Sequence, residues 1–235
     1  MPDEVDFSAV ADRFYVFPAG GAVRRRWHLN RLRLFELMGI SRDHVVLDAG
    51  CGAGNLVFMI APHCRVAVGC DAYHDRLAFG AKRGRGAYVQ ASIEELPLAE
   101  ESIDKILCLE VLEHLKASNS RRVLLEFHRV LRPDGQLLIT TPNYRSPWPA
   151  IEFAMEALGL VPKVPGNDHL SKYNRQTLTC ALAAAGFHVL RGGSFNHLSP
   201  FAAALSERWA ERLYHWELRA NPPGGNLLYC LLKKA

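Results

Sequence analysis

The segment from Val45 to Asn55 constrains the fold of this chain more than any other part of the sequence. It reads VVLDAGCGAGN, an apolar run that ends at the acid Asp48 and continues into a loop with Gly50, Gly52 and Gly54. A short apolar run without polar alternation is typical of a strand buried on both faces, and glycine accepts the positive φ angles of a tight turn. The segment therefore predicts a strand, a turn and a helix, the first unit of a parallel sheet.

Strands and helices are predicted to alternate along the following hundred residues. The strand candidates are 45–48, 65–71, 88–91, 105–109 and 136–141, and the helix candidates are 55–61, 75–83 and 118–131. The last of these strands follows a turn at 132–135. This alternation indicates an α/β protein with a mostly parallel sheet and helices on both faces.

The flanking regions add further elements. A helix at 22–38 should end at Gly39, and prolines at 142, 147, 149, 162 and 165 surround a short helix at 150–158, a composition typical of a lid. A helix at 175–185, closed by Gly186, precedes a strand at 187–190, a helix at 201–216 and a final strand at 227–232. We expect one domain with a helical cap (1–40), a cofactor-binding core (41–143) and a lid with acceptor-side elements and the last strands (144–235).

The charge at the first strand end distinguishes between cofactors. A dinucleotide fingerprint has a third glycine where this chain has Asn55, and the carboxylate of Asp48 would repel a pyrophosphate. The same carboxylate would attract the ammonium and sulfonium groups of S-adenosylmethionine. The sign of this charge therefore favours S-adenosylmethionine over a dinucleotide.

Polar residues also follow the other predicted strands, at the sheet edge where ligands of parallel sheets bind. Asp71 ends the second strand, where an acid can accept hydrogen bonds from both ribose hydroxyls; Ser92 and Ile93 follow the third, and Glu110 ends the fourth. Helix capping and turn formation would explain each acid or glycine singly. They do not explain why these residues recur at successive strand ends.

Four motifs in order resemble the class I S-adenosylmethionine-dependent methyltransferases, in particular the small-molecule type of the ubiquinone pathway (methyltransferase domain 11 type). They are VVLDAGCGAGN, the acid in VAVGCDAY, ASIEELPLAEESIDKILCLEVLEHL and VLRPDGQLLITTPN, within residues 45–143. The resemblance implies a Rossmann-like sheet of seven strands whose last strand is antiparallel. It also implies that S-adenosylmethionine is the cofactor and S-adenosylhomocysteine the product.

The resemblance assigns roles to the residues at the strand ends. Asp48, Gly50, Gly52 and Gly54 would hold the methionine end, Asp71 the ribose, and Ser92 with Ile93 the adenine; Glu110 would face the cofactor. The family usually has an aspartate at the position of Ser92. A hydroxyl there would form a hydrogen bond without ionic assistance.

Candidates for chemistry on the methyl acceptor lie at two places. Glu110, Glu113 and His114 form an E-x-x-E-H motif, which is associated with metal in ubiquinone-pathway O-methyltransferases and in small-RNA 2′-O-methyltransferases but occurs in many relatives without one. His169 lies in a His-hydrophobic-Ser-x-aromatic stretch that often lines the acceptor site, and Tyr144 follows the fifth strand. We expect His114 and His169 to be catalytic if they converge, and we favour structural roles for the motif over a metal site formed by Glu110, Glu113, His114 and His169.

Composition limits the remaining possibilities. The chain has 235 residues, of which 49% are hydrophobic, and its six cysteines lack C-x-x-C spacing, as expected of buried thiols in a reducing compartment. No secretory or membrane-spanning segment is visible, so we expect a cytoplasmic protein. The net charge of +4 arises largely from arginines at 24–26, 31 and 33, for which a solvated helix face is favoured over nucleic-acid binding.

Two apolar groups have no assigned partner. Phe201, Leu205, Trp209, Leu213 and Trp216 form a helical stripe near three arginines, which we expect to pack on the domain or lid; a membrane-surface or dimer contact is the alternative. The second group, near the N-terminus, could cover the cofactor cleft or staple the first helix; it comprises Phe7, Phe14, Tyr15 and Phe17.

The sequence thus indicates methyl transfer to a small-molecule or lipid- or sugar-linked acceptor, with oxygen favoured because a histidine-carboxylate cluster suits a hydroxyl. An RNA 2′-O-methyltransferase, a dinucleotide-dependent dehydrogenase and a non-catalytic binding or scaffold protein remain alternatives. Oligomeric state is not indicated.

Overall fold

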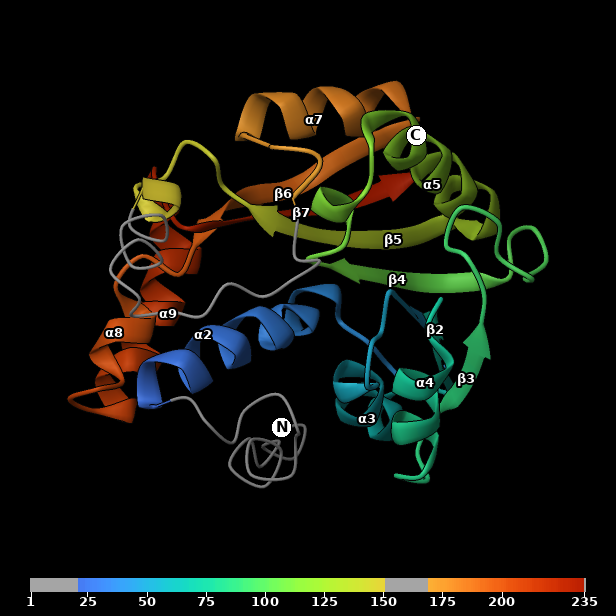
Figure 1. Cartoon of the computed structure of the whole chain (residues 1–235), viewed down its shortest axis with the longest axis horizontal. Helices are drawn as coiled ribbons and strands as arrows, with labels where there is room; N and C mark the ends of the chain where they lie inside the picture. The colour runs from blue at the N-terminus through green and yellow to red at the C-terminus, as the bar shows by residue number, and fades with distance from the viewer. Residues whose placement is uncertain (1–20, 151–168, 235) are drawn as a thin grey trace.

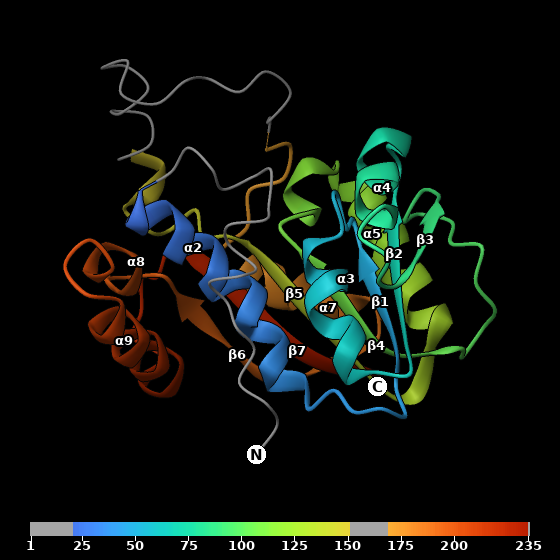
Figure 2. The same cartoon turned by 90° about the horizontal axis from the view of Figure 1, so that it is seen from below.

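A computed structural model of the chain describes residues 21–150 and 169–234. Most of the predicted short helix at 150–158, the prolines at 162 and 165, and the N-terminal aromatic group lie outside the described residues. The described part is built on one sheet with helices on both faces (Figures 1 and 2).

The sheet has seven strands in the order β3-β2-β1-β4-β5-β7-β6. β7 runs antiparallel to both β5 and β6, and the β1–β2, β1–β4, β2–β3 and β4–β5 pairs are parallel. The predicted Rossmann-like fold with an antiparallel last strand is therefore confirmed. The strands are β1 (Val45–Ala49), β2 (Val66–Asp71), β3 (Ala87–Gln90), β4 (Ile103–Leu109), β5 (Leu131–Pro142), β6 (Phe187–Phe195) and β7 (Leu227–Lys234).

Helices cover the two faces of the sheet and bury two apolar clusters. On one face, α5 (Ala117–Val130) and α7 (Arg175–Ala184) pack Phe127 and Leu182 against strand residues such as Leu47. On the other face, Leu34 and Tyr214 belong to a cluster that includes Val46. Adjacent residues of β1 thus point into different clusters, as a strand buried on both faces requires.

The second face is covered by elements from both ends of the chain. They are α2 (Ala22–Leu32), the 3-10 helix η1 (Arg33–Met38), α3 (Asn55–Ile60) with the 3-10 turn η2 (Ala61–His63), and α9 (Glu207–Ala220). The other helices within the described residues are α4 (His74–Ala81), the 3-10 turn η3 (Leu112–His114) and α8 (Ser199–Ala202). The helix predicted at 22–38 is thus present, although its last six residues form a 3-10 helix.

Three predicted boundaries were wrong. The turn at 132–135 lies inside β5, because Ile103 pairs with Leu131 and Lys105 with Gln136, so the intervening residues form a bulge. The strand predicted at 187–190 continues to Phe195, because pairing with β7 carries it across two glycines. The helix predicted at 55–61 continues as a 3-10 turn to His63, since a proline is tolerated in a first turn.

The helix predicted at 201–216 was also wrong, because it consists of α8 and α9. Ser206 separates the two helices and accepts a hydrogen bond from the backbone N–H of Trp209, the geometry of an N-cap. The predicted packing of its apolar stripe was wrong as well. α9 turns Tyr214 and Leu218 toward the core, so Trp209 and Trp216 are exposed.

The arginine cluster in α2 and η1 departs from the predicted solvated face. A guanidinium nitrogen of Arg26 lies 2.6 Å from Oε2 of Glu211, and one of Arg33 lies 2.6 Å from Oε1 of the same carboxylate. Arg26 is buried. These ion pairs join the start of the described chain to α9.

The remaining composition-based expectations agree with the structure in part. All six cysteines are free thiols, and four of them are buried, whereas Cys51 is half-buried and Cys180 is exposed. Among the described helices, none combines the length and the apolar character that crossing a bilayer requires.

Candidate active site

The glycine loop after β1 is held against the end of β2. The backbone N–H groups of Gly50 and Cys51 both donate to the carbonyl oxygen of Cys70, at 2.8 and 2.9 Å. Gly50 has a φ of 79°, and a Cβ atom there would lie 2.6 Å from Cγ2 of Val111. Only glycine therefore fits this turn without moving the segment that follows β4.

Asp71, at the end of β2, fastens the same loop. Its Oδ2 accepts the N–H of Gly52 at 2.8 Å, and its Oδ1 accepts the N–H of Tyr73 at 3.0 Å. An ionised carboxylate offers about four lone-pair positions, so two acceptor positions remain for a ligand. Asp71 thus shapes the loop and can still accept further hydrogen bonds.

Asp48 lies at the end of β1 and is buried. Among the described residues, its Oδ2 has no hydrogen-bond partner. Burial raises the pKa of Asp48 to about 7, against the opposing charge of Arg31 and with the added repulsion of Asp71. A buried acceptor without a partner is costly, and a cationic ligand group would satisfy it.

Two more buried carboxyl groups follow β4. Glu110 has a φ of 59°, in the left-handed region, and its N–H donates to the carbonyl oxygen of Thr140 at 3.2 Å. Burial raises the pKa of Glu110; burial and then repulsion from Glu110 raise the pKa of Glu113 well above its ordinary value. A non-glycine residue in this conformation costs free energy, and such strain gathers at functional sites.

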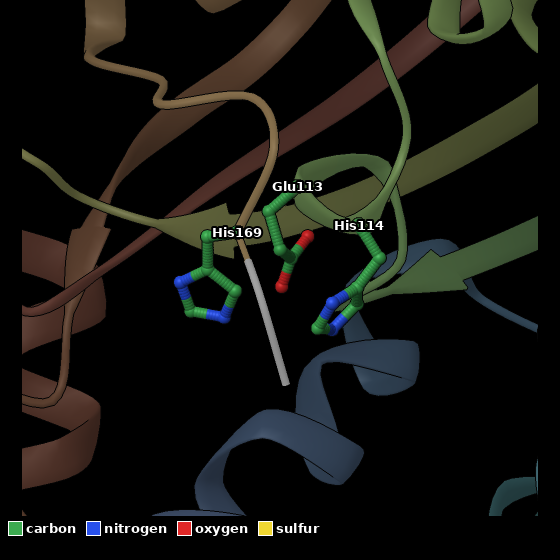
Figure 3. Close-up of side chains that lie close together, drawn as sticks. All are labelled: Glu113, His114 and His169. Atoms are coloured by element: carbon green, nitrogen blue, oxygen red, sulfur yellow. The ribbon is translucent and has the colours of Figure 1, made fainter. Parts of the chain in front are cut away.

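Glu113 and two histidines converge, although His169 lies far from the other two along the chain. Figure 3 shows the side chains of Glu113, His114 and His169 turned toward one another, and their potential ligand atoms all lie within 4.8 Å of one another. The two imidazole rings meet edge to face, with centroids 5.1 Å apart. Oη of Tyr144 lies 2.5 Å from Nδ1 of His169.

Backbone hydrogen bonds bring these distant segments together. The N–H of Ser171 donates to the carbonyl oxygen of Glu113 at 3.0 Å, and the Ser171 hydroxyl donates to that of Leu115 at 2.6 Å. The N–H of Tyr144 donates to the carbonyl oxygen of Tyr173 at 2.9 Å. The segment that contains Ser171 and Tyr173, before α7, therefore lies hydrogen-bonded between η3 and the end of β5.

Comparison with known proteins shows what the central part of the chain resembles. Residues 47–139 match the family model described as a methyltransferase domain. A probable S-adenosylmethionine-dependent methyltransferase of Mycolicibacterium smegmatis is 33% identical over 153 residues, which cover 61% of this chain and 52% of that protein. Over this central part, the chain is similar to S-adenosylmethionine-dependent methyltransferases.

Other relatives differ in what their names say they modify. A tRNA (carboxymethyluridine(34)-5-O)-methyltransferase of Arabidopsis thaliana is 36% identical over 105 residues, which cover 44% of this chain and 25% of that protein. A solved structure of a possible histamine N-methyltransferase from Thermotoga maritima has a TM-score of 0.66 at 18% identity, covering 91% of each chain. This chain spans about half the length, or less, of the two curated relatives, and at this identity the solved structure supports the fold alone.

The methyltransferase fold brings most of the predicted site residues to one edge of the sheet. Gly50, Gly52 and Gly54 all have positive φ angles, and Asp48 and Asp71 end adjacent strands. The convergence of His114 and His169 that the sequence left conditional is present. Glu110, by contrast, lies outside the cluster of Glu113 and the two histidines.

The positions of Ser92 and Ile93 do not test their predicted contact with adenine. The N–H of Ala91 donates to the carbonyl oxygen of Asp71, so this segment does begin beside the glycine loop. The Ser92 hydroxyl, however, accepts the N–H of Glu94 at 3.2 Å, and Ile93 packs partly against the core. The roles of Ser92 and Ile93 toward adenine therefore stay predictions.

Sequence reasoning missed Arg31 as a residue of this candidate site. Its charge favours the ionised forms of Asp48, Glu110 and Glu113, so it acts on all three buried carboxyl groups. A signal was present, because Arg31 lies four residues from both Trp27 and Phe35 and thus within the apolar stripe of its helix. A charged residue in such a stripe indicates a partner on the buried side.

Proposed function

We propose that the protein transfers a methyl group from S-adenosylmethionine to a hydroxyl oxygen of a small-molecule or lipid- or sugar-linked acceptor. The observation that carries the proposal is the convergence of His114 and His169 beside Glu113 at the edge of the sheet that holds the glycine loop. A hydroxyl acceptor must lose a proton during transfer, whereas a neutral amine can attack before it does. Two imidazoles near the reacting groups therefore suit oxygen.

The donor is proposed to occupy the glycine loop. Its ammonium and sulfonium groups would offset the buried negative charge of Asp48 and Glu110, each of which has an oxygen without a hydrogen-bond partner among the described residues. The ribose hydroxyls would take the free acceptor positions of Asp71, and the adenine would lie along Ser92 and Ile93. The bound donor supplies an activated methyl group.

The work of the protein is then to align the acceptor and remove its proton. Alignment alone can supply roughly 7–11 kcal/mol in the best cases. For Nε2 of His169 to act as the base, its Nδ1 must carry the hydrogen and donate to Oη of Tyr144. His114, 5.1 Å away between ring centroids, is the second candidate for the base.

A cation-assisted version of the reaction is the second candidate. Glu113, His114 and His169 offer one carboxylate oxygen and two ring nitrogens within 4.8 Å, a set that suits a divalent transition metal. A cation there would favour the ionised form of Glu113 and lower the pKa of a hydroxyl that it binds. We favour the base mechanism and treat the cation as the alternative.

Other functions compete with this proposal. The relative from Arabidopsis is named for a tRNA substrate, so RNA is a rival acceptor; a scaffold that binds the donor without transfer is another. A dinucleotide-dependent dehydrogenase is disfavoured by the charge of Asp48. The division into a cap (1–40), a core (41–143) and a lid region (144–235) also stays a proposal.

Calorimetry and methyl transfer together test the proposal. The full chain should bind S-adenosylmethionine but not NAD, and it should move the labelled methyl group to hydroxyl compounds in an acceptor panel that also contains amines and RNA. His114→Ala and His169→Ala should abolish transfer while leaving donor affinity within about twofold. Binding of NAD alone would refute the cofactor assignment, and transfer only to RNA or amines would refute the acceptor.

A further inference from the structure

The outer face of α8, α9 and the turn between them exposes large apolar side chains. Leu205 is 92% exposed, Trp209 60%, Trp216 53% and Phe201 43%. Trp209 and Trp216 are seven residues apart in α9, which places them two turns apart on one side of the helix. Surface tryptophans gathered in this way mark an interaction surface.

A row of arginines lies beside the tryptophans. Arg208, Arg212 and Arg219 are exposed. Helical spacing places them in a row along α9, next to the side of the helix that carries Trp209 and Trp216. No ion pair to any of the three arginines is formed by the described residues. The outer face of α9 therefore has an apolar half and a positively charged half.

The acidic residues of α9 are either paired with arginines of α2 and η1 or buried. Glu211 pairs with Arg26 and Arg33, and Glu207 pairs with Arg25 at 3.1 Å. The third acid, Glu217, is buried. The uncompensated charge of the outer face is therefore positive.

Hydrogen bonds attach α8 and α9 to the rest of the domain, so their outer face is held toward the outside. Oε1 of Glu217 accepts the N–H groups of Leu198 and Ser199, each at 2.8 Å, and Oε2 accepts the Ser199 hydroxyl. Nδ2 of Asn30, in α2, donates to Oδ1 of Asn196 and to the Ser199 hydroxyl. Figures 1 and 2 show α8 and α9 together beside α2 at one end of the molecule.

We propose that the outer face of α8 and α9 binds the surface of an anionic lipid membrane. Tryptophan favours the boundary between lipid headgroups and acyl chains, and arginines beside it are attracted to anionic headgroups. An acidic protein partner would satisfy the arginines but would not by itself account for a nearly fully exposed Leu205. The helix would lie in the plane of the surface and expose its apolar half to the lipid.

This inference goes beyond methyl transfer and does not depend on it. The proposed membrane surface and the candidate site are linked through α2, because Arg26 pairs with Glu211 of α9 and the charge of Arg31 acts on Asp48. Lipid binding would thus bring the active site close to lipid-linked molecules.

Vesicle sedimentation of the full chain tests the proposal. We expect binding to phosphatidylcholine vesicles that contain phosphatidylglycerol, with a blue shift of tryptophan emission, and weak binding to phosphatidylcholine alone. Replacing Arg208, Arg212 and Arg219 by Gln should weaken binding about tenfold or more. Trp209→Ala with Trp216→Ala should weaken it and remove the blue shift.

A matched control removes the same charge elsewhere. Arg42, Arg65 and Arg121 are exposed and lie outside α8 and α9, and their replacement by Gln should change vesicle binding less than twofold. Equal loss in both triple variants would mean nonspecific attraction and would overturn the proposal. So would absence of binding to anionic vesicles, or sedimentation velocity showing that the two tryptophans instead hold a dimer.

Discussion

Oη of Tyr144 lies 2.5 Å from Nδ1 of His169, a hydrogen bond between residues 25 positions apart in the chain. Tyr144 follows β5, and His169 comes from the segment before α7. The hydrogen bond involves Nδ1 of His169, so under the proposed base mechanism Nε2 is the nitrogen that would take the proton. The orientation of the proposed base therefore depends on a residue outside the E-x-x-E-H motif.

Tyr144→Phe should change the tautomer balance of His169 without changing donor affinity. Loss of one hydrogen bond should also lower the free energy of unfolding by about 0.5–1.5 kcal/mol. Long-range proton–nitrogen NMR spectra of the histidine rings report the tautomer, and calorimetry reports donor binding. Tyr73→Phe, at an exposed tyrosine, is the control; unchanged His169 signals in Tyr144→Phe would contradict the assigned bond.

Donor affinity should depend on pH through Asp48. Its pKa is raised to about 7, so the carboxyl group becomes neutral as the pH falls below that value and loses its attraction for the donor cations. The dissociation constant of S-adenosylmethionine should then rise by up to about tenfold per pH unit. Calorimetry between about pH 5.5 and 8.5 measures this slope.

Asp48→Asn extends the same test. The variant should bind the donor at least about tenfold more weakly near pH 8, with a flat pH profile. Because a raised carboxyl pKa destabilises the folded state increasingly as pH rises toward 7, the variant without donor should unfold at a higher temperature than the wild type near pH 8. Asp43→Asn, at an exposed acid, should leave both quantities unchanged; a steep pH profile in Asp48→Asn would assign the titration to another group.

Glu211→Gln should destabilise the joint between α2 and α9. Burial alone would raise the pKa of Glu211, but hydrogen bonds from Arg33 and Arg26 outweigh it and lower the pKa to about 2. The stabilisation is therefore complete above the ordinary pKa of about 4.5 and is lost as the pH falls through about 2. Urea unfolding should show a loss of roughly 2 kcal/mol near pH 7 that shrinks in acid.

Glu207→Gln is the control for the joint, since Glu207 is more exposed, pairs with Arg25 at 3.1 Å and lies farther from Arg26, at 3.6 Å, than Glu211 does. It should cost about 0–1 kcal/mol. Equal losses of unfolding free energy in the two variants at neutral pH would contradict the prediction, because they would show that Glu211 stabilises the joint no more than Glu207 does.

Glu113→Gln separates the base mechanism from the cation alternative. Burial and repulsion from Glu110 raise the pKa of Glu113, so an amide there should stabilise the protein near pH 8, by on the order of 1 kcal/mol. Under the base mechanism, chelators should leave methyl transfer unchanged. Micromolar binding of Mn²⁺ by calorimetry, abolished in both Glu113→Gln and His169→Ala, would favour the cation instead.

Most of the fold was predictable because it depends on local pattern. The run of apolar residues in β1, the glycines after it and the acids at the ends of β1 and β2 each impose their geometry on neighbouring residues. The errors in the strands came where pairing across the sheet overrode local signals. β6 extends through glycines, and β5 contains a turn, because neighbouring strands supply the missing hydrogen bonds.

The sequence by itself determined the class of fold, the glycine loop and the sign of the charge beside it, since these follow from residue type and short-range spacing. Only the tertiary structure decided that His169 meets His114 and that Arg31 acts on three buried carboxyl groups. It also decided which face of α9 is exposed, because both sides of that helix carry apolar residues at helical spacing. Contacts between residues far apart in the chain depend on how helices and strands pack, and the short-range spacing of residues does not specify that packing.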